Sequence, residues 1–403
     1  DFKAINFMKV RASYGVLGND KIPSNGYVGY LNGEGVYVFD NTITTGVAIG
    51  ALANPSLKWE NARKFDAGVD LKFFSNKLDF TYDYFVETRE DLLIAGLPVS
   101  GITGVGGPGG YPPTVNAGST RNIGHEMSLG WNQKIGNDFS FNVNYNITTI
   151  NNMVTKVNNG TGVLQSGSFG VGQQPIARME KGYSIGYFYG LQTDGIFQNQ
   201  AEVDAHPTQI ALGAAAQPGD IRFKDVNGDG VINLNDRTKV GSPLADYTMG
   251  FNVTMNYKNF DFAAYSYASV GNEMVRNYER SVSDLNKMNY VLGRWTGEGS
   301  SNSVPRVTTE ATTNNLFSDY FVEDASFLRI QNIQLGYTFA NSLSQKVGIT
   351  KLRLYSSVNN PFTFTRYRGF DPTGSNGAAI GGGIDYGFYP SPKIFILGLN
   401  LNF

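Results

Sequence analysis

Apolar and polar residues alternate along five long segments of the chain. Around Tyr145, for example, Phe141, Val143 and Ile147 share one face of an extended chain, and the positions between them are asparagine or threonine. Residues 65–73, 78–86, 139–147, 249–257 and 395–403 carry this period-two pattern. A helical period is absent, so the sequence predicts an all-β protein whose strands separate an apolar from a polar environment.

The connections between these strands alternate between short and long. Short turns are predicted at Ser75-Asn76, Gly136-Asn137 and Lys258-Asn259, and long connections over residues 90–121, 197–247 and 270–327. A soluble sandwich has strands of about five or six residues, whereas these run to about ten. The pattern favours a portion of an antiparallel transmembrane β-barrel with short periplasmic turns and long extracellular loops.

Strand parity gives an expected strand count. If the chain ends on the periplasmic side, an even number of strands lies between residues 146 and 249, and residues 173–179 and 186–197 are the candidates. Together with a first strand over residues 5–16 and a short turn over 340–350, this predicts about 12 strands. The apolar positions change face near Asn332, which predicts a β-bulge there.

Composition narrows the class of protein further. The 403 residues carry 32 Lys+Arg against 34 Asp+Glu, and charged residues make up only 16% of the chain. A near-neutral chain without a basic stripe argues against a nucleic-acid partner. No run of about 18 apolar residues predicts a helical span, and the absence of cysteine excludes thiol catalysis and zinc-thiolate sites. The first residues read as an internal cut or a processed end rather than a signal peptide.

Several motifs are spread over nearly the whole chain. They are MKVRASYGVLGND from Met8, NPSLKWENARKFDAGVDLKFF from Asn54, GYFYGLQTDGIF from Gly186, GDIRFKDVNGDGVINLNDRTKVGSP from Gly219, YFVEDASFLRIQNIQLGYTF from Tyr320, NNPFTFTRYRGFDP from Asn359 and the closing strand through Phe403. These motifs resemble those of one family, the SusC/RagA-type TonB-linked outer-membrane receptors of the Bacteroidota. Their order is similar to that of the C-terminal half of the family barrel, which has 22 strands. The resemblance therefore implies that residues 1–403 are the C-terminal part of the barrel, without the plug domain and the TonB-binding segment.

The resemblance also implies a location and a function. It places the protein in the outer membrane as a multi-pass β-barrel that contacts lipid and pairs with the rest of the barrel. The implied activity is TonB-dependent import of a nutrient ligand, glycan or peptide, together with a SusD-like surface lipoprotein, with TonB acting through the missing N-terminal part. The alternative is a receptor-like barrel that imports nothing and serves as a scaffold in an outer-membrane assembly or secretion complex.

One loop has the spacing of a calcium site. Oxygen ligands occur at positions one, three, five, seven and twelve, and glycine occurs at position six. The expected ligands are Asp225, Asn227, Asp229, the Val231 carbonyl and Asp236, and a calcium ion there would brace the extracellular loop over residues 198–246. The alternative is a metal-free turn, because Asn, Asp and Gly also form turns.

Other residues carry weaker signals. His125 shares its face with Met127 and Leu129 and is expected to point towards lipid, and neither it nor His206 has a nucleophile and an acid at suggestive spacing, so no enzyme is predicted. Acidic residues on the polar face of residues 65–87 are interpreted as a wetted barrel wall with compensating charges. Six aromatic residues in or near the outer loops are candidate ligand contacts or members of an interfacial girdle: Tyr111, Trp295, Tyr367, Phe370, Tyr386 and Tyr389.

Overall fold

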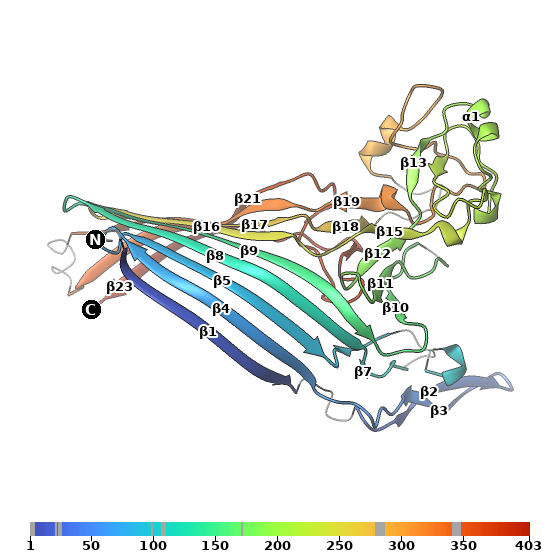
Figure 1. The fold of residues 1–403 in the computed structure, drawn as a ribbon, viewed down its shortest axis with the longest axis horizontal. Coiled ribbons are helices and arrows are strands. Elements are labelled where there is room, and N and C mark those ends of the chain that lie inside the picture. Colours follow the sequence, from blue (N-terminus) through green and yellow to red (C-terminus); the bar gives the residue numbers. More distant parts are fainter. Residues whose placement is uncertain are drawn as a thin grey trace.

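The computed structural model describes residues 5–20, 22, 26–97, 100–105, 110–170, 172–278, 287–340 and 348–403. One antiparallel sheet of ten strands dominates it, curved as a section of barrel wall (Figure 1). In spatial order the strands are β1 (Ile5–Asn19), β4 (Glu60–Phe73), β5 (Leu78–Glu90), β8 (Gly118–Ile135), β9 (Phe139–Val157), β16 (Tyr247–Tyr257), β17 (Phe260–Val270), β20 (Phe327–Thr338), β21 (Lys351–Thr365) and β23 (Ile394–Asn402). The predicted all-β antiparallel fold is confirmed, and the alternating segments are its strands.

Short turns gather at one end of the sheet, which we call the short-turn rim. Phe74, Ser75 and Asn76 take positive φ values of 52°, 58° and 64° between β4 and β5, and Gly136 does so between β8 and β9. The pairing of Phe139 with Tyr257 places the β8–β9 turn beside the β16–β17 turn, as parity predicted. The predicted turn over 340–350 falls mostly on residues 341–347, outside the described residues.

The predicted count of about 12 membrane strands is wrong for the described residues, because the main sheet has ten. Strand β9 pairs directly with β16, so no strands intervene. The two segments assigned to the wall instead form β11 (Ala177–Glu180), β12 (Tyr187–Gly190) and β13 (Thr193–Ile196), each only four residues long. Strands this short cannot cross a bilayer, which takes about nine to eleven residues, and their alternation reflects burial within the loops. The predicted bulge near Asn332 is confirmed by a register shift between Ile330 and Asn332.

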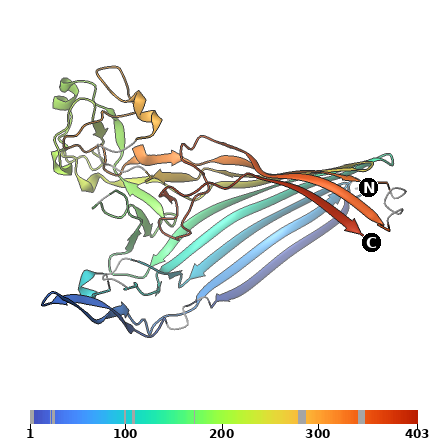
Figure 2. The ribbon, with the colours of Figure 1, turned by 180° about the vertical axis from the view of Figure 1, so that it is seen from behind.

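Long connections gather at the opposite end, the long-loop rim, and form a folded cap with its own small sheets (Figure 2). Its strands are β2 (Tyr30–Phe39), β3 (Thr42–Ala51), β6 (Leu93–Ile94), β7 (Val115–Asn116), β10 (Val163–Ser166), β14 (Ile221–Phe223), β15 (Thr238–Gly241), β18 (Glu273–Arg276), β19 (Val322–Asp324) and β22 (Ile384–Asp385), besides β11 to β13. Its helices are α1 (Gln200–Ala205) and the short 3₁₀ helices η1 (Gly101–Thr103), η2 (Ile210–Leu212), η3 (Leu234–Asp236), η4 (Asn289–Gly293) and η5 (Asp319–Phe321). No helix in the described part of the chain is long and apolar enough to cross a membrane.

The sheet is open in the structure. Strands β1 and β23 are its two ends, and each pairs with one neighbour only, β4 and β21 respectively. The start of β1 and the end of β23 lie at the short-turn rim (Figure 1). The buried apolar clusters lie in the cap and at its junction with the sheet rather than within the wall.

Candidate functional site

One face of the sheet, the polar face, carries charges that compensate one another. Arg11 on β1 makes ion pairs with Asp70 on β4, at 2.9 Å, and with Asp83 on β5, at 3.0 Å. Lys64 and Lys72 pair likewise with Glu87, at 2.6 Å, and Asp79, at 3.3 Å. These pairs agree with the interpretation of a wetted wall, because they leave the face hydrophilic with little net charge.

A glycine makes room for one of these pairs. Gly68 lies between Arg11 and Asp83 in the strand register. A Cβ atom built on Gly68 would lie 1.9 Å from the Asp83 Oδ1 atom. The missing side chain therefore lets the Asp83 carboxylate lean across β4 to reach Arg11.

A concavity of about 490 Å³ lies where this polar face meets the cap. We call it the rim concavity. Arg89, Asn122 and Asn152 line it from the wall, and Glu273 and residues 372–375 and 377–379 line it from the cap. The Asn152 amide donates to Asn122 at 2.6 Å and accepts from the Ile185 backbone at 2.8 Å. The lining thus combines amides, one cation and one acid, a set suited to hydrogen bonding with hydroxyl or amide groups of a ligand.

Glu273 is the half-buried acid of this concavity. Burial raises the pKa of its carboxyl above the usual 4.5, although the Ser242 backbone amide donates to its Oε2 atom at 2.8 Å. Asp371, at the edge of the same cap segment, has a carboxyl whose pKa is lowered instead of raised. Burial favours its neutral form, but amides of Ser391 and Thr373 and the Arg329 guanidinium hold the pKa of its carboxyl well below 3.8.

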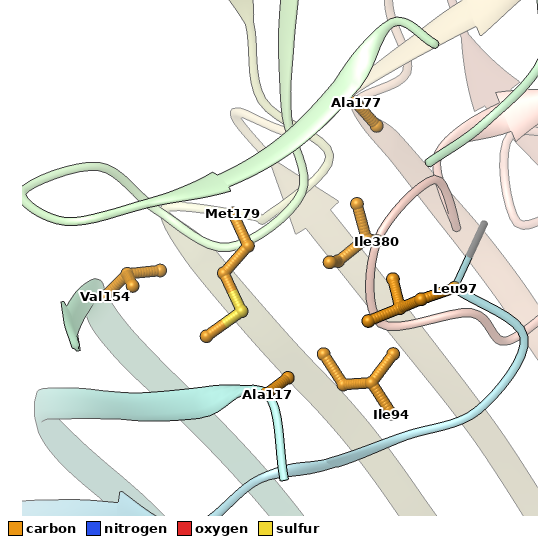
Figure 3. Close-up of a cluster of buried hydrophobic side chains, with 7 residues drawn as sticks. All are labelled: Ile94, Leu97, Ala117, Val154, Ala177, Met179 and Ile380. Atoms are coloured by element: carbon orange, nitrogen blue, oxygen red, sulfur yellow. The ribbon is translucent and has the colours of Figure 1, made fainter. Parts of the chain in front are cut away.

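A buried apolar cluster braces the concavity (Figure 3). It joins the β5–β8 connection, the ends of β9 and β11, and the β21–β23 connection at Ile380. Its members are Ile94, Leu97, Ala117, Val154, Ala177, Met179 and Ile380, each at most 8% exposed. Packing of these residues fixes three long connections against the rim of the wall, so the concavity is built on an ordered base.

The loop with calcium-type spacing is ordered by its own hydrogen bonds. Asp225 accepts from the Gly228 and Gly230 amides at 2.7 and 2.8 Å, and Asp236, which is fully buried, accepts from Val226 and Asn233 at 2.9 and 2.8 Å. The Gly230 amide first, and then the Gly228 amide, keep the pKa of Asp225 below 3.8.

The donor set of this loop is of the oxygen type that calcium takes. Gly228 and Gly230, with φ of 74° and 82°, let the backbone wrap around the carboxylates. No group of three or more His, Cys, Asp or Glu side chains in the described residues has metal-binding geometry. In this loop Asp225 and Asp236 accept hydrogen bonds from backbone amides.

The six aromatic candidates differ in exposure and in their partners. Tyr389, Tyr111 and Phe370 are 93%, 65% and 60% exposed. Tyr386 donates to the Ser168 carbonyl at 3.0 Å, and Trp295 packs against Gly219. Tyr367 is only 5% exposed and donates to Asp385 at 2.5 Å, while burial, with that bond, raises the pKa of its hydroxyl. Its ring therefore offers little surface to a ligand.

Sequence reasoning did not identify the rim concavity. Its wall residues, Asn122 and Asn152, lie on the polar face of strands that were correctly predicted, but nothing in the pattern distinguishes them from other polar-face positions. Glu273 and residues 372–379 come from connections more than a hundred residues away in the chain. Only folding of the cap onto the wall brings them together.

The fold and this site define the wall of a membrane β-barrel with a polar face and a folded outer cap. Residues 2–189 match the family described as TonB dependent receptor-like, beta-barrel. The whole chain is 32% identical to TonB-dependent receptor P3 of Formosa agariphila and 29% identical to TonB-dependent receptor SusC of Bacteroides thetaiotaomicron, covering 40% and 38% of those proteins. It is also similar to a solved structure of the RagAB peptide importer in its closed-closed state, with a TM-score of 0.74, 25% identity, and coverage of all of this chain and 41% of that one.

The chain is similar to the β-barrel part of TonB-dependent receptors of the SusC type, as its motifs indicated. It spans about 40% of the length of the curated relatives that it matches. This family consists of outer-membrane receptors and transporters rather than enzymes.

Proposed function

We propose that the chain forms the C-terminal half of an outer-membrane importer that takes up a nutrient ligand, glycan or peptide, by TonB-dependent transport. The observation that carries this proposal is the rim concavity of about 490 Å³ on the polar face. A ligand held there lies where the capped end of the barrel opens into its hydrophilic interior. The similar RagAB structure is that of a peptide importer, which supports an oligomeric ligand of the same kind.

Import by this barrel requires parts beyond these residues. The unpaired edges of β1 and β23 must pair with further strands, because open edges are not tolerated in hydrocarbon. We propose that the rest of the same barrel supplies them, that TonB acts through the N-terminal part, and that a SusD-like lipoprotein covers the cap. The competing scaffold function does not require a hydrogen-bonding concavity on the polar face.

The test fills the concavity in the full-length receptor. Ala378 lines the concavity and is exposed, so Ala378→Trp narrows it without disturbing the buried cluster. Ala215→Trp is the matched control, because Ala215 is an exposed alanine of the cap outside the concavity. We expect uptake of the ligand to fall by about tenfold or more in Ala378→Trp, as for the loss of about 1.4 kcal/mol of binding, at equal surface levels. Equal uptake by both variants would remove the concavity from the transport path.

We also propose that calcium binds the loop of Asp225, Asn227, Asp229, the Val231 carbonyl and Asp236 and orders the extracellular segment 198–246 against the cap. The oxygen donors and the wrapped glycine backbone support this proposal. The ion would supply attraction between carboxylates that otherwise repel one another, and would shift them from backbone amides to shared coordination.

Limited proteolysis of the full-length receptor in calcium and in chelator tests the calcium site. We expect calcium to slow cleavage within residues 198–246 and Asp229→Ala to abolish that protection while barrel assembly stays intact. Asp204→Ala is the control, because Asp204 is an exposed acid on α1 that pairs only with Gln200 among described residues. Cleavage rates that do not depend on calcium in the wild type would mean that the loop is a metal-free turn.

A further inference from the structure

The outer face of the sheet, opposite the polar face, is apolar for most of its height but carries a polar group of residues near the long-loop rim. His125 and Arg121 are exposed there, in line with the apolar Met127, Leu129 and Trp131 of β8. The Tyr82 hydroxyl bonds to His125 Nδ1 at 2.8 Å, and the Tyr84 ring lies 5.3 Å from the imidazole. A cation on a surface that faces lipid costs free energy, unless a polar group of the surroundings offsets that cost.

The height of Arg121 places it at a membrane interface. Trp131, ten positions further along β8, packs against Phe74 beside the short-turn rim, in the manner of an interfacial aromatic girdle. Ten residues at about 3.3 Å each, on a strand tilted by about 40°, rise by about 25 Å, which is the height of the apolar band of such barrels. Arg121 therefore lies at the level of the opposite headgroups.

The charge of Arg121 has no ion-pair partner among the described residues. Strand register places Arg63, Thr88 and Arg121 in one row across β4, β5 and β8. Arg63 pairs with Glu90 at 3.0 Å, whereas Arg121 has no ion pair or hydrogen bond within the described part of the chain. Asp246 is the acid on the same concave surface, and it lies beyond ion-pair distance of Arg121.

The surface around Arg121 is hollowed. A concavity of about 510 Å³ is lined by Arg121, Ile123, His125, Asn151, Met153 and Tyr247. Arg121, Asn151 and the acid Asp246 lie towards the rim, and apolar side chains continue below towards the middle of the band. A ligand with an anionic head and acyl chains matches this arrangement of charge above and apolar surface below.

We propose that this concavity binds the phosphate of an anionic outer-leaflet lipid, with Arg121 as the principal contact and His125 and Asn151 as further donors. The guanidinium forms charge-assisted hydrogen bonds with phosphate oxygens, often in pairs. The acyl chains lie along Ile123 and Met127 of the outer face. The inference rests on the placement of the wall in the outer membrane and is independent of which ligand the barrel imports.

The test is native mass spectrometry of the full-length receptor with lipid A as the probe, in its phosphorylated and enzymatically dephosphorylated forms. Arg121→Gln removes the uncompensated charge. Arg63→Gln is the matched control, since it removes an arginine at the same height whose charge Glu90 already neutralises. Because both side chains are exposed, we expect both variants to fold, and their heat-modifiable electrophoretic mobility checks this.

We expect phosphorylated lipid A to bind Arg121→Gln about tenfold more weakly than wild type, the loss of one hydrogen bond to a charged group, and Arg63→Gln to bind as wild type. Dephosphorylated lipid A should bind all three proteins equally weakly. Equal binding of phosphorylated lipid A by the two variants would overturn the proposal. Complete displacement of the lipid by millimolar inorganic phosphate would also overturn it, because free phosphate would then be the occupant.

Discussion

Met179 offers the most direct test of how the cap is held on the wall. Its side chain is fully buried in the cluster of Figure 3, where it reaches Ala117 and Val154 at the ends of β8 and β9. Space around it is tight, since a Cβ atom on Gly118 would lie 3.0 Å from the Met179 methyl carbon. Met179→Ala removes these contacts and leaves a cavity that neighbouring strands, fixed by the sheet, cannot close.

The expected magnitude follows from this burial. Truncation of a buried methionine to alanine costs about 2–5 kcal/mol. At about 1.4 kcal/mol per factor of ten, the opening of the cap becomes about 30- to 3,000-fold more frequent. The strands of the wall should be unaffected, because their pairing lies outside the cluster.

Hydrogen exchange measures this opening directly. The Val154 amide donates to the Tyr183 carbonyl at 2.8 Å, the Gly182 amide to Val154 at 2.9 Å and the Asn158 amide to Ala117 at 2.8 Å, so these three amides report on the cluster. Their exchange should accelerate in Met179→Ala, while amides of β16 and β17 keep their protection. Met153→Ala is the control, since Met153 is 40% exposed on the outer face and its loss should change exchange by about twofold at most.

If the three amides exchange at wild-type rates in Met179→Ala, the apolar cluster does not hold the cap, and the ordered base inferred for the rim concavity is lost. Faster amide exchange throughout β16 and β17 would contradict the expected independence of the wall. It would show that cap and wall unfold as one unit.

Two further predictions concern charges. Gly68→Ala should place a methyl group against Asp83 and break the ion pair of Asp83 with Arg11. The free energy of unfolding should fall by about 1–3 kcal/mol, the cost of leaving a partly buried polar group unsatisfied. Gly15→Ala is the control and should be neutral, because no atom lies within 4 Å of the added methyl group; equal thermal midpoints of the two variants would refute this. Acidification should loosen the cap, because the lowered pKa values of Asp225 and Asp324 give stability that is present above 3.8 and lost as the pH falls below it. Glu273 has a raised pKa, which has the opposite effect: it favours the folded state below 4.5, and that effect is lost as the pH rises. Because the asparagine cannot be protonated, proteolysis of the cap should quicken less between pH 5 and 3 in Asp225→Asn than in wild type.

Local chemistry determined much of this fold before any tertiary contact was known. Period-two alternation requires only that the two sides of a strand meet different environments, so β4, β5, β9, β16 and β23 were predictable from their residues alone. Turn formers fixed the short-turn rim in the same way, and the change of face near Asn332 revealed the bulge. Family motifs pointed to the receptor class for the same reason, since they are local in sequence.

Tertiary structure decided what depends on distant segments. Strand parity is satisfied by any even number of strands between β9 and β16, including none. Only the direct pairing of β9 with β16 showed that the two short segments belong to the cap and not to the wall. The rim concavity joins Asn122 to Glu273. The outer-face concavity depends on a register that gives Arg63 an ion-pair partner and leaves Arg121 without one in the part of the chain that the structure describes. Alternation tells which face a side chain takes, but the neighbour it meets there is set by strand register and by how long loops pack, and those follow from the free energy of the whole assembled sheet.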